Sequence, residues 1–482
     1  MKRQDQSKLN HLTEGPVLAT LALFALPALG SNFLQSVNGS INALWVGQSL
    51  GARGVAATAN ANIVVFMMLS LTFGFAMASS ILIGQNMGRG DVQGMRRALG
   101  AGLGLFVVLG VLSAVIGWLA SPALLHLLGT PPEVYDWALA YLRVMFLGLP
   151  MALITVFFGL ALRSVGDSLS PLLLQVPGMV IDIGLNPVLI RGLWGAPRLG
   201  IAGSALATLL ANLVSMLVML GFIYARDLPV RLRGREWRYL VPPMDTLWMI
   251  LAKGVPMGLQ MIVMTGSAIV LLGYVNAGGT NVVAAYGANT QLWTYIQMPG
   301  MAIGMAVSAM VAQNIGAGRW DRVSAITRAG LVVNFLLTGL LVLLILLFDR
   351  EILNLFLPHN AVAIGVGRQI AGVTDWGFLI MGTTMVLTGV PRANGATLAP
   401  LLILIVAYIP GRLGAIMLLK PLLGLGAVWW SFPIGGAISL TLTTSYYLKG
   451  SWRKISLIAT IDEAEEYMQS EADPAGRMLP NA

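Results

Sequence analysis

Long apolar stretches separated by short polar breaks follow one another along almost the whole chain. Each stretch has about the ~20 residues that an α-helix needs to cross the hydrocarbon core of a bilayer, or more. The pattern therefore predicts an all-α polytopic membrane protein with twelve transmembrane helices. These are expected at residues 16–47, 55–85, 98–120, 135–162, 169–190, 199–224, 246–275, 282–313, 327–348, 366–390, 398–420 and 424–448.

The longest polar break, residues 226–245, divides the chain near its middle. We expect it to be a cytoplasmic linker between an N-lobe, residues 16–225, and a C-lobe, residues 246–448, with six helices each. A short cytoplasmic N-terminus, residues 1–15, and an acidic cytoplasmic tail, residues 449–482, are expected to flank the two lobes.

The two halves carry matching short motifs. Gln85–Gly88 (QNMG) corresponds to Gln313–Gly316 (QNIG), and Arg163–Gly166 (RSVG) corresponds to Arg392–Gly395 (RANG). Because each half has an even number of spans, the halves share one orientation, and a pseudo-twofold axis along the membrane normal is expected to relate them. Such repeats are typical of transporters that work by alternating access. We expect the arginine that opens each RSVG or RANG motif to anchor its loop to lipid headgroups or helix ends.

Positive charge is distributed unevenly between the polar breaks. With the N-terminus placed in the cytoplasm, the segments on that side carry 20 Lys and Arg residues, and those on the other side carry five. Basic residues of short loops stay on the cytoplasmic side of a membrane. We therefore expect a protein of the cell inner membrane with both termini in the cytoplasm.

Composition excludes several classes of protein. Hydrophobic residues make up 57% of the chain and charged residues 10%, against about 25% charged residues in soluble domains, so a soluble enzyme is excluded. The chain has no Cys, three scattered His residues and no GxxxxGK phosphate loop. We expect no enzyme activity, no metal, no cofactor and no use of ATP. The net charge of +9 is explained by the bilayer rather than by nucleic acid, and a monomer is expected.

Only two acidic residues, Asp182 and Asp375, lie well inside predicted spans, and a charge in hydrocarbon is costly enough to suggest a function. Asp182 shares a helix face with Asn186. Burial away from water favours the neutral form of a carboxylate, so Asp182 is a candidate to bind and release a proton. Coordination of sodium and a purely structural hydrogen bond are the alternatives. The predicted set for the coupling ion is Asp182, Asn186, Asn42 and Asn38, and Gln35 of the same first-span stripe is expected in the substrate cavity.

Methionines recur at helical spacing on two spans of the C-lobe. Met adapts to ligands of different shapes, and aromatic rings bind cations on their faces, so this wall suits bulky aromatic cations. Ordinary packing against core or lipid is the alternative. Asp375 is expected to be a substrate counter-ion, or to form an ion pair with Arg368 or Arg412. The predicted cavity residues are Met257, Met261, Met264, Tyr295, Met298, Met301 and Asp375.

Pro27 and Pro256 occupy matching positions in the two halves, and Pro177 precedes Asp182 in its span. Proline bends helices, and interrupted helices in corresponding places of two repeats often mark the working site. We therefore expect these three prolines to be hinges, with a static kink as the alternative.

Several of these motifs together resemble those of the multidrug and toxic compound extrusion (MATE) family. The resemblance covers about residues 14–450 and rests on Leu26-Pro27, Trp45–Gly51, Gly84–Gly88 and Leu162–Asp167 with Pro171. It implies two six-helix lobes around a V-shaped cavity. It also implies the export of organic cations and drugs, driven by a proton or a sodium gradient.

The residues at the ion sites of this family narrow the resemblance. The span-one Asp of proton-coupled members is replaced by Asn42, and their span-five order of Asn and then Asp is reversed as Asp182 and Asn186. The carboxylates of sodium-coupled, NorM-like members fall on Met264 and Met381. The resemblance therefore implies a chain closer to the proton-coupled, DinF-like members, with one carboxylate at its coupling site.

Taken together, these features predict secondary active efflux of a small hydrophobic or cationic molecule by antiport, with the proton as the expected coupling ion. Sodium coupling at the same N-lobe site is one alternative. A lipid-linked oligosaccharide flippase on a related scaffold is another, although its cavity would need cationic side chains for pyrophosphate. A gated pore is the third.

Overall fold

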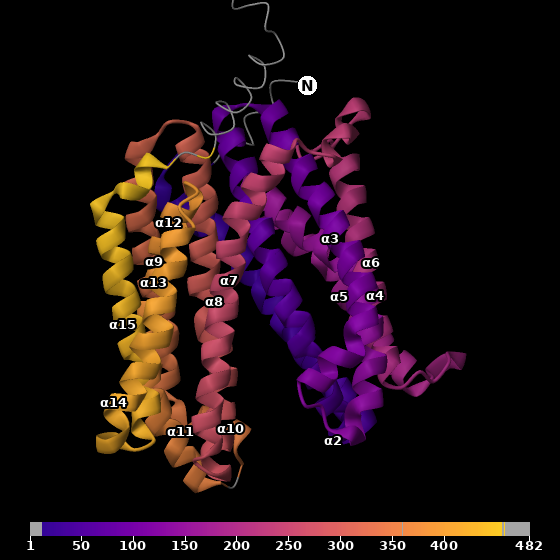
Figure 1. Ribbon diagram of the computed structural model, residues 1–482, viewed down its shortest axis with the longest axis vertical. Helices are drawn as coiled ribbons and strands as arrows, with labels where there is room; N and C mark the ends of the chain where they lie inside the picture. Colours follow the sequence, from indigo (N-terminus) through magenta and orange to yellow (C-terminus); the bar gives the residue numbers. More distant parts are fainter. Residues whose placement is uncertain (1–11, 359, 456, 458–482) are drawn as a thin grey trace, which may run out of the picture.

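The computed structural model describes residues 12–358, 360–455 and 457. This part of the chain is almost entirely helical and contains no strand, so the all-α prediction is confirmed. Figure 1 shows two bundles of helices, with the N-terminal half in indigo and magenta and the C-terminal half in rose to yellow. The bundles approach each other where α2 meets α7 and α8.

The helices of the N-lobe have the following bounds: α2 (Val17–Arg89), α3 (Val92–Leu127), α4 (Pro132–Ser164), α5 (Leu169–Arg191) and α6 (Ile201–Ala225). Those of the C-lobe are α7 (Met244–Asn276), α8 (Thr280–Gly316), α9 (Trp320–Leu347), α10 (Asp349–Phe356), α11 (Ala361–Thr374), α12 (Trp376–Ala393), α13 (Leu398–Val406), α14 (Gly414–Leu423) and α15 (Gly426–Lys449).

Twelve membrane-spanning segments result once the longest helix is divided. In the described residues, ten helical stretches are long and apolar enough to cross a bilayer. The 73 residues of α2 would extend about 110 Å. Gly51 interrupts α2 with a φ of 67°, a conformation that glycine adopts readily, so α2 supplies two crossings. The 24 residues of α15, about 36 Å long, supply the twelfth, which confirms the predicted number.

The segment between the lobes is fixed to α3. Its short helix η2 (Gly234–Leu240) lies on α3 at Gly100 and Gly104, where an added Cβ atom would overlap Tyr239 or Leu240. A guanidinium nitrogen of Arg96 also lies 2.7 Å from a carboxylate oxygen of Glu236. The linker is therefore packed as part of the N-lobe.

One end of the molecule carries the turns that follow α2, α4, α8 and α12. Arg89, Arg163, Arg319 and Arg392 lie at these turns, and we call this end the basic end. It is the end that the charge distribution predicts to face the cytoplasm.

At the basic end, α2 and α8 cross so closely that only glycine fits. A Cβ atom on Gly88 would overlap the carbonyl oxygen of Gln313, and one on Gly316 would overlap that of Gln85. Small residues allow membrane helices to approach in this way. These four residues belong to the repeated QNMG and QNIG motifs, so the two copies of this motif form the contact between the lobes. We call this contact the glycine crossing.

Two hydrogen bonds related by the same repeat flank the glycine crossing. Nε2 of Gln85 donates to the carbonyl oxygen of Ala393 at 2.6 Å, and Nε2 of Gln313 donates to that of Ser164 at 2.7 Å. Each glutamine thereby satisfies the carbonyl at the end of a helix in the opposite lobe, which otherwise lacks a partner. The repeated RSVG and RANG motifs begin at these two helix ends.

The segment before α2 also ties the lobes together. Its carbonyl oxygens accept hydrogen bonds from the end of α8 and from the turn after it: Asn314 donates to Leu12 at 2.9 Å, and Arg319 donates to Thr13 at 2.6 Å. The start of the N-lobe is therefore bound to the C-lobe at the basic end.

We predict that Gly316→Ala destabilises the protein, because the new methyl group has to push α8 away from α2. Overpacking of this kind costs about 1–3 kcal/mol. Gly287→Ala in the same helix is the matched control, because nothing lies within 4 Å of its added Cβ and alanine favours helix. Thermal unfolding of the two purified variants checks the prediction. Equal unfolding temperatures would show that the crossing is not tight.

Candidate functional site

A cluster of polar side chains surrounds Asp182 in the middle of the N-lobe. One carboxylate oxygen, Oδ2, accepts hydrogen bonds from Nδ2 of Asn38 at 2.8 Å and from Nδ2 of Asn42 at 2.7 Å. Nδ2 of Asn186 donates to Oδ1 of Asn42 at 3.0 Å. The structure thus brings together all four residues predicted for the coupling ion, from α5 and from the first arm of α2.

Two further residues take part in this cluster. The hydroxyl group of Thr208 in α6 donates to Oδ1 of Asp182 at 3.1 Å and also to the carbonyl oxygen of Ser204. Tyr141 of α4 is buried close to Asp182. Sequence reasoning did not find them, because a threonine or tyrosine in an apolar span usually has a local partner.

Two amide oxygens of the cluster have no hydrogen-bond donor. Asp182 is 2% exposed and Asn186 is fully buried. Among the described residues, nothing donates to the buried Oδ1 atoms of Asn38 and Asn186. A buried acceptor without a partner costs about 1–3 kcal/mol. The cluster can therefore accept a proton or a small cation beside the carboxylate.

A central cavity with about 1690 Å³ of empty space opens next to this cluster. It is lined by Asp182, Asn38 and Gln35 from the N-lobe, and by Met261 and Met301 from the C-lobe. Nε2 of Gln35 donates to Oε1 of Gln175 across it at 3.2 Å. Gln35 thus lies in the cavity where the sequence predicted it.

A second cavity, with about 1080 Å³ of empty space, lies in the C-lobe beside α2, and methionine is the commonest residue in its lining. We call it the C-lobe cavity. Its methionines are Met77, Met257, Met261, Met264, Met301, Met305, Met381 and Met385.

Four of the five methionines predicted as cavity residues lie there, but Met298 and Tyr295 do not. Met298 is 7% exposed and buried within the lobe, and Tyr295 is half-buried. Neither lines a described cavity, because α8 turns Met301 and Met305 toward that space instead. The aromatic rings of the C-lobe cavity are those of Phe73 and Tyr408.

Asp375 lies apart from both cavities, contrary to its prediction as a cavity residue. It is fully buried, and its Oδ1 accepts a hydrogen bond from Nε1 of Trp293 at 2.9 Å. The predicted ion pair with Arg368 is wrong, since Arg368 instead lies 2.9 Å from Asp349. No ion pair between Asp375 and Arg412 occurs in the described part of the chain either.

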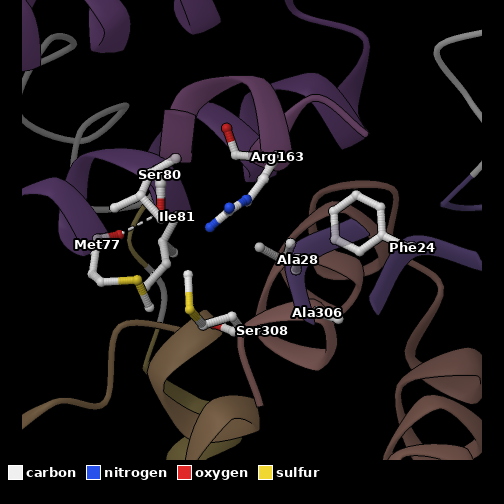
Figure 2. Close-up of a pocket in the computed structure, with 13 residues that line it drawn as sticks. Phe24, Ala28, Met77, Ser80, Ile81, Arg163, Ala306 and Ser308 are labelled. Carbon is white, nitrogen blue, oxygen red and sulfur yellow. Dashed lines mark hydrogen bonds between the residues drawn. The ribbon is translucent and has the colours of Figure 1, made fainter. Parts of the chain in front are cut away.

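Arg163 and Arg392 line cavities, where they do not reach lipid headgroups, and the alternative that they anchor their loops to helix ends stays a prediction. Figure 2 shows the guanidinium group of Arg163 pointing into a pocket with about 410 Å³ of empty space between α2, α4 and α8, with Ile81 beside it. Arg392 lines the C-lobe cavity. Within the described residues, the buried Nε atoms of both arginines lack a hydrogen-bond partner.

Helices α2, α5 and α7 continue through Pro27, Pro177 and Pro256. The only residue with non-helical backbone angles inside α2 is Gly51. The hinge role of the three prolines therefore stays a prediction. Within the described residues, no group of three or more His, Cys, Asp or Glu side chains could hold a metal ion.

We predict that Met298→Trp lowers the unfolding temperature more than Met301→Trp does. The larger ring has no room at the buried position, where overpacking costs about 1–3 kcal/mol, whereas at Met301 it can enter the two cavities. Thermal unfolding of both purified variants checks this. The assignment of the cavity face of α8 fails if Met301→Trp is the less stable protein.

Comparison with known proteins gives a consistent result. The MatE family model matches residues 27–188 and 256–415. The chain is 34% identical over 440 residues to the "Probable multidrug resistance protein YoeA" of Bacillus subtilis (strain 168), covering 91% of this chain and 95% of that protein. It is 30% identical over 450 residues to the "Probable multidrug resistance protein YpnP" of the same organism, covering 93% and 99%.

Solved structures share the fold. One titled "Crystal structure of MATE in complex with MaL6" superimposes with a TM-score of 0.85 at 21% identity, covering 92% of this chain and 99% of that one. Another, "Crystal structure of MATE in the bent conformation", gives a TM-score of 0.84 at 21% identity, covering 93% and 98%.

Proposed function

The chain belongs to the MATE family of transporters, and on this premise we propose that it exports small hydrophobic compounds in exchange for protons bound at Asp182. Family membership makes it a polytopic membrane transporter for multidrug efflux rather than an enzyme. The coupling ion, the residues that bind it and the alternation between the lobes belong to the proposal. A location in the inner membrane with the basic end in the cytoplasm is part of it.

The hydrogen bonds of Asp182 are the observation that carries the proposal. An ionised carboxylate only accepts hydrogen bonds, whereas a protonated one also donates. Asp182 accepts from three side chains, two on the first arm of α2 and one on α6. A proton on Oδ2 cannot coexist with both amide donors at that atom, so one asparagine has to turn or move. Asn38 has a free amide oxygen that can receive the new O–H group.

Protonation therefore changes the contact between α2 and α5. In the proposed cycle, the ionised form faces the outer side, and a proton from that side neutralises Asp182 and releases the exported compound. The rearranged first arm of α2, with Pro27 near its start, then favours opening of the glycine crossing at the basic end. Loss of the proton to the cytoplasm and binding of the next compound return the lobes to their first arrangement.

Sodium coupling at the same cluster is the second candidate. Oxygen atoms are the ligands that hard cations prefer, and the free Oδ1 atoms of Asn38 and Asn186 lie in the cluster that holds the carboxylate. Among the described residues no carboxylate lines the C-lobe cavity, where Met264 and Met381 occupy the positions at which sodium-coupled members are expected to have carboxylates.

We predict that Asp182→Asn abolishes transport driven by a pH gradient. The amide cannot exchange a proton, so the gradient loses its coupling group. Proteoliposomes loaded with one cationic, one neutral and one acidic fluorescent amphiphile, each under a separately imposed pH or sodium gradient, measure this. We expect the pH gradient to drive at least one compound in the wild type.

Asp375→Asn is the matched control, because Asp375 is buried away from the cavities and an amide oxygen can still accept from Trp293. It should retain pH-driven transport. The proton mechanism is contradicted if Asp182→Asn still couples to the pH gradient. Transport driven by sodium alone would replace it with the second candidate.

A further inference from the structure

We propose that the C-lobe cavity binds the acidic group of an amphipathic compound through Arg412, with Arg392 as a second cationic side chain. The proposal rests on the proposed function only in taking the bound compound to be the exported one. The proposal gives the bound compound a negative charge, whereas the methionines of the C-lobe led us to expect a cation.

The charges that line the cavities differ between the lobes. The central cavity contains Asp182 and Arg163, so its charges have both signs. The C-lobe cavity contains Arg392, and an adjoining pocket of about 370 Å³ contains Arg412. No Asp or Glu lines either of these two spaces in the described part of the chain. The C-lobe therefore presents positive charge alone to a bound molecule.

Arg412 is buried in the middle of a membrane-spanning segment without an ion pair. Its side chain belongs to the stretch Leu398–Leu423 and is 6% exposed. Its Nε and Nη2 atoms are buried, and none of the described residues forms a hydrogen bond with them. A charged group in the membrane interior is costly unless it is paired, which points to a partner that is not part of the described chain.

Aromatic rings hold the face of this guanidinium group and leave its edge free. The carbon atom Cζ of Arg412 lies 3.6 Å from the ring centre of Phe432 and 5.6 Å from that of Tyr408. Cation–π contacts of this kind occupy the flat face. The N–H groups point outward along the edge, and a carboxylate can accept from two of them at once.

The local backbone is unusual at this position. Ala407–Leu413 forms a π-helix between α13 and α14, and single π-turns inside α-helices are frequent at functional sites. The extra residue of such a turn changes the direction of the side chains after it. Gly435 and Gly436 of α15 line the Arg412 pocket without a side chain, whereas Phe432 of the same helix lines it with its ring.

The shapes of the two spaces suit an amphipathic ligand. The Arg412 pocket and the C-lobe cavity share Met381, Tyr408 and Gly436 as lining residues. An acidic group beside Arg412 would place the apolar body of the same molecule against the methionines of the C-lobe cavity. Asp375 forms no ion pair with Arg412 among the described residues: its Oδ1 accepts from Trp293 and Thr374, and its buried Oδ2 has no partner.

Equilibrium binding without any ion gradient tests the proposal. The full chain in lipid nanodiscs is titrated with three probes that share one naphthyl-alkyl body: a carboxylate, its methyl ester and its trimethylammonium analogue. We expect wild type to bind the carboxylate about tenfold more tightly than the ester, as a charge-assisted hydrogen bond implies. We expect Arg412→Met to remove this preference while leaving the affinity for the ester unchanged.

Two further variants keep the test decisive if Arg412→Met does not fold. Arg412→Lys retains the charge without the planar fork and should keep part of the preference, and Arg392→Met should reduce it. Arg143→Met is the matched control, because Arg143 has a buried Nε atom and lies over Trp118 but lines neither of the two C-lobe spaces. It should bind all three probes as wild type does.

Several results would overturn the proposal. These are equal or tighter binding of the ester or the ammonium probe by wild type, no binding of any probe, and an unchanged preference in the Arg412 and Arg392 variants. The proposed function fails independently of these results. Transport driven by a pH gradient with no carboxylate preference would leave proton antiport intact, whereas carboxylate binding without such transport would leave only the arginine site for an acidic group.

Discussion

The glycine crossing at the basic end is the contact on which the arrangement of the two lobes depends. Gly88 and Gly316 let α2 and α8 touch through their backbones. Farther along the same arm of α2, Gly74 is equally close to the backbone of α7 at Gly254 and Gly258. Because the lobes are joined along this part of α2, the rest of the helix is free to diverge from the C-lobe. The central cavity lies between the diverging parts and is lined from both lobes.

Ion binding and the contact between the lobes lie in different parts of the molecule. The cluster around Asp182 lies within one lobe, so a proton there acts on the packing of α2 against α5 and α6. The contact that has to open lies at the other end of the same α2. The close approach at the crossing is made by backbone atoms, and the glutamines beside it bond to carbonyl oxygens. Water can replace such bonds on separation, which suits an interface that opens and closes.

The sequence predicts most of the fold but only part of the site. The spans could be predicted because their number and position follow from the length of the apolar stretches. The cluster around Asp182 could be predicted because few polar side chains other than the asparagines of the first span are available to bind an intramembrane carboxylate. The direction in which the arginine side chains point could not be predicted in this way. It depends on the π-helix around Arg412 and on the burial of the helix end at Arg392. The prediction that Asp375 lines the substrate cavity is wrong for a related reason. A buried acid indicates a partner, but not whether it lies in a cavity or, like Trp293, within the core.

The most direct test of this account is the distance between the two lobes at the basic end as a function of pH. The chain contains no Cys, so Gln93→Cys in α3 and Asp321→Cys in α9, both exposed, can carry a pair of spin labels for pulsed electron paramagnetic resonance. The account predicts that lowering the pH adds a longer distance, and that Asp182→Asn shows one distance distribution at every pH. The same pH dependence in wild type and Asp182→Asn would contradict the claim that a proton on Asp182 governs the glycine crossing.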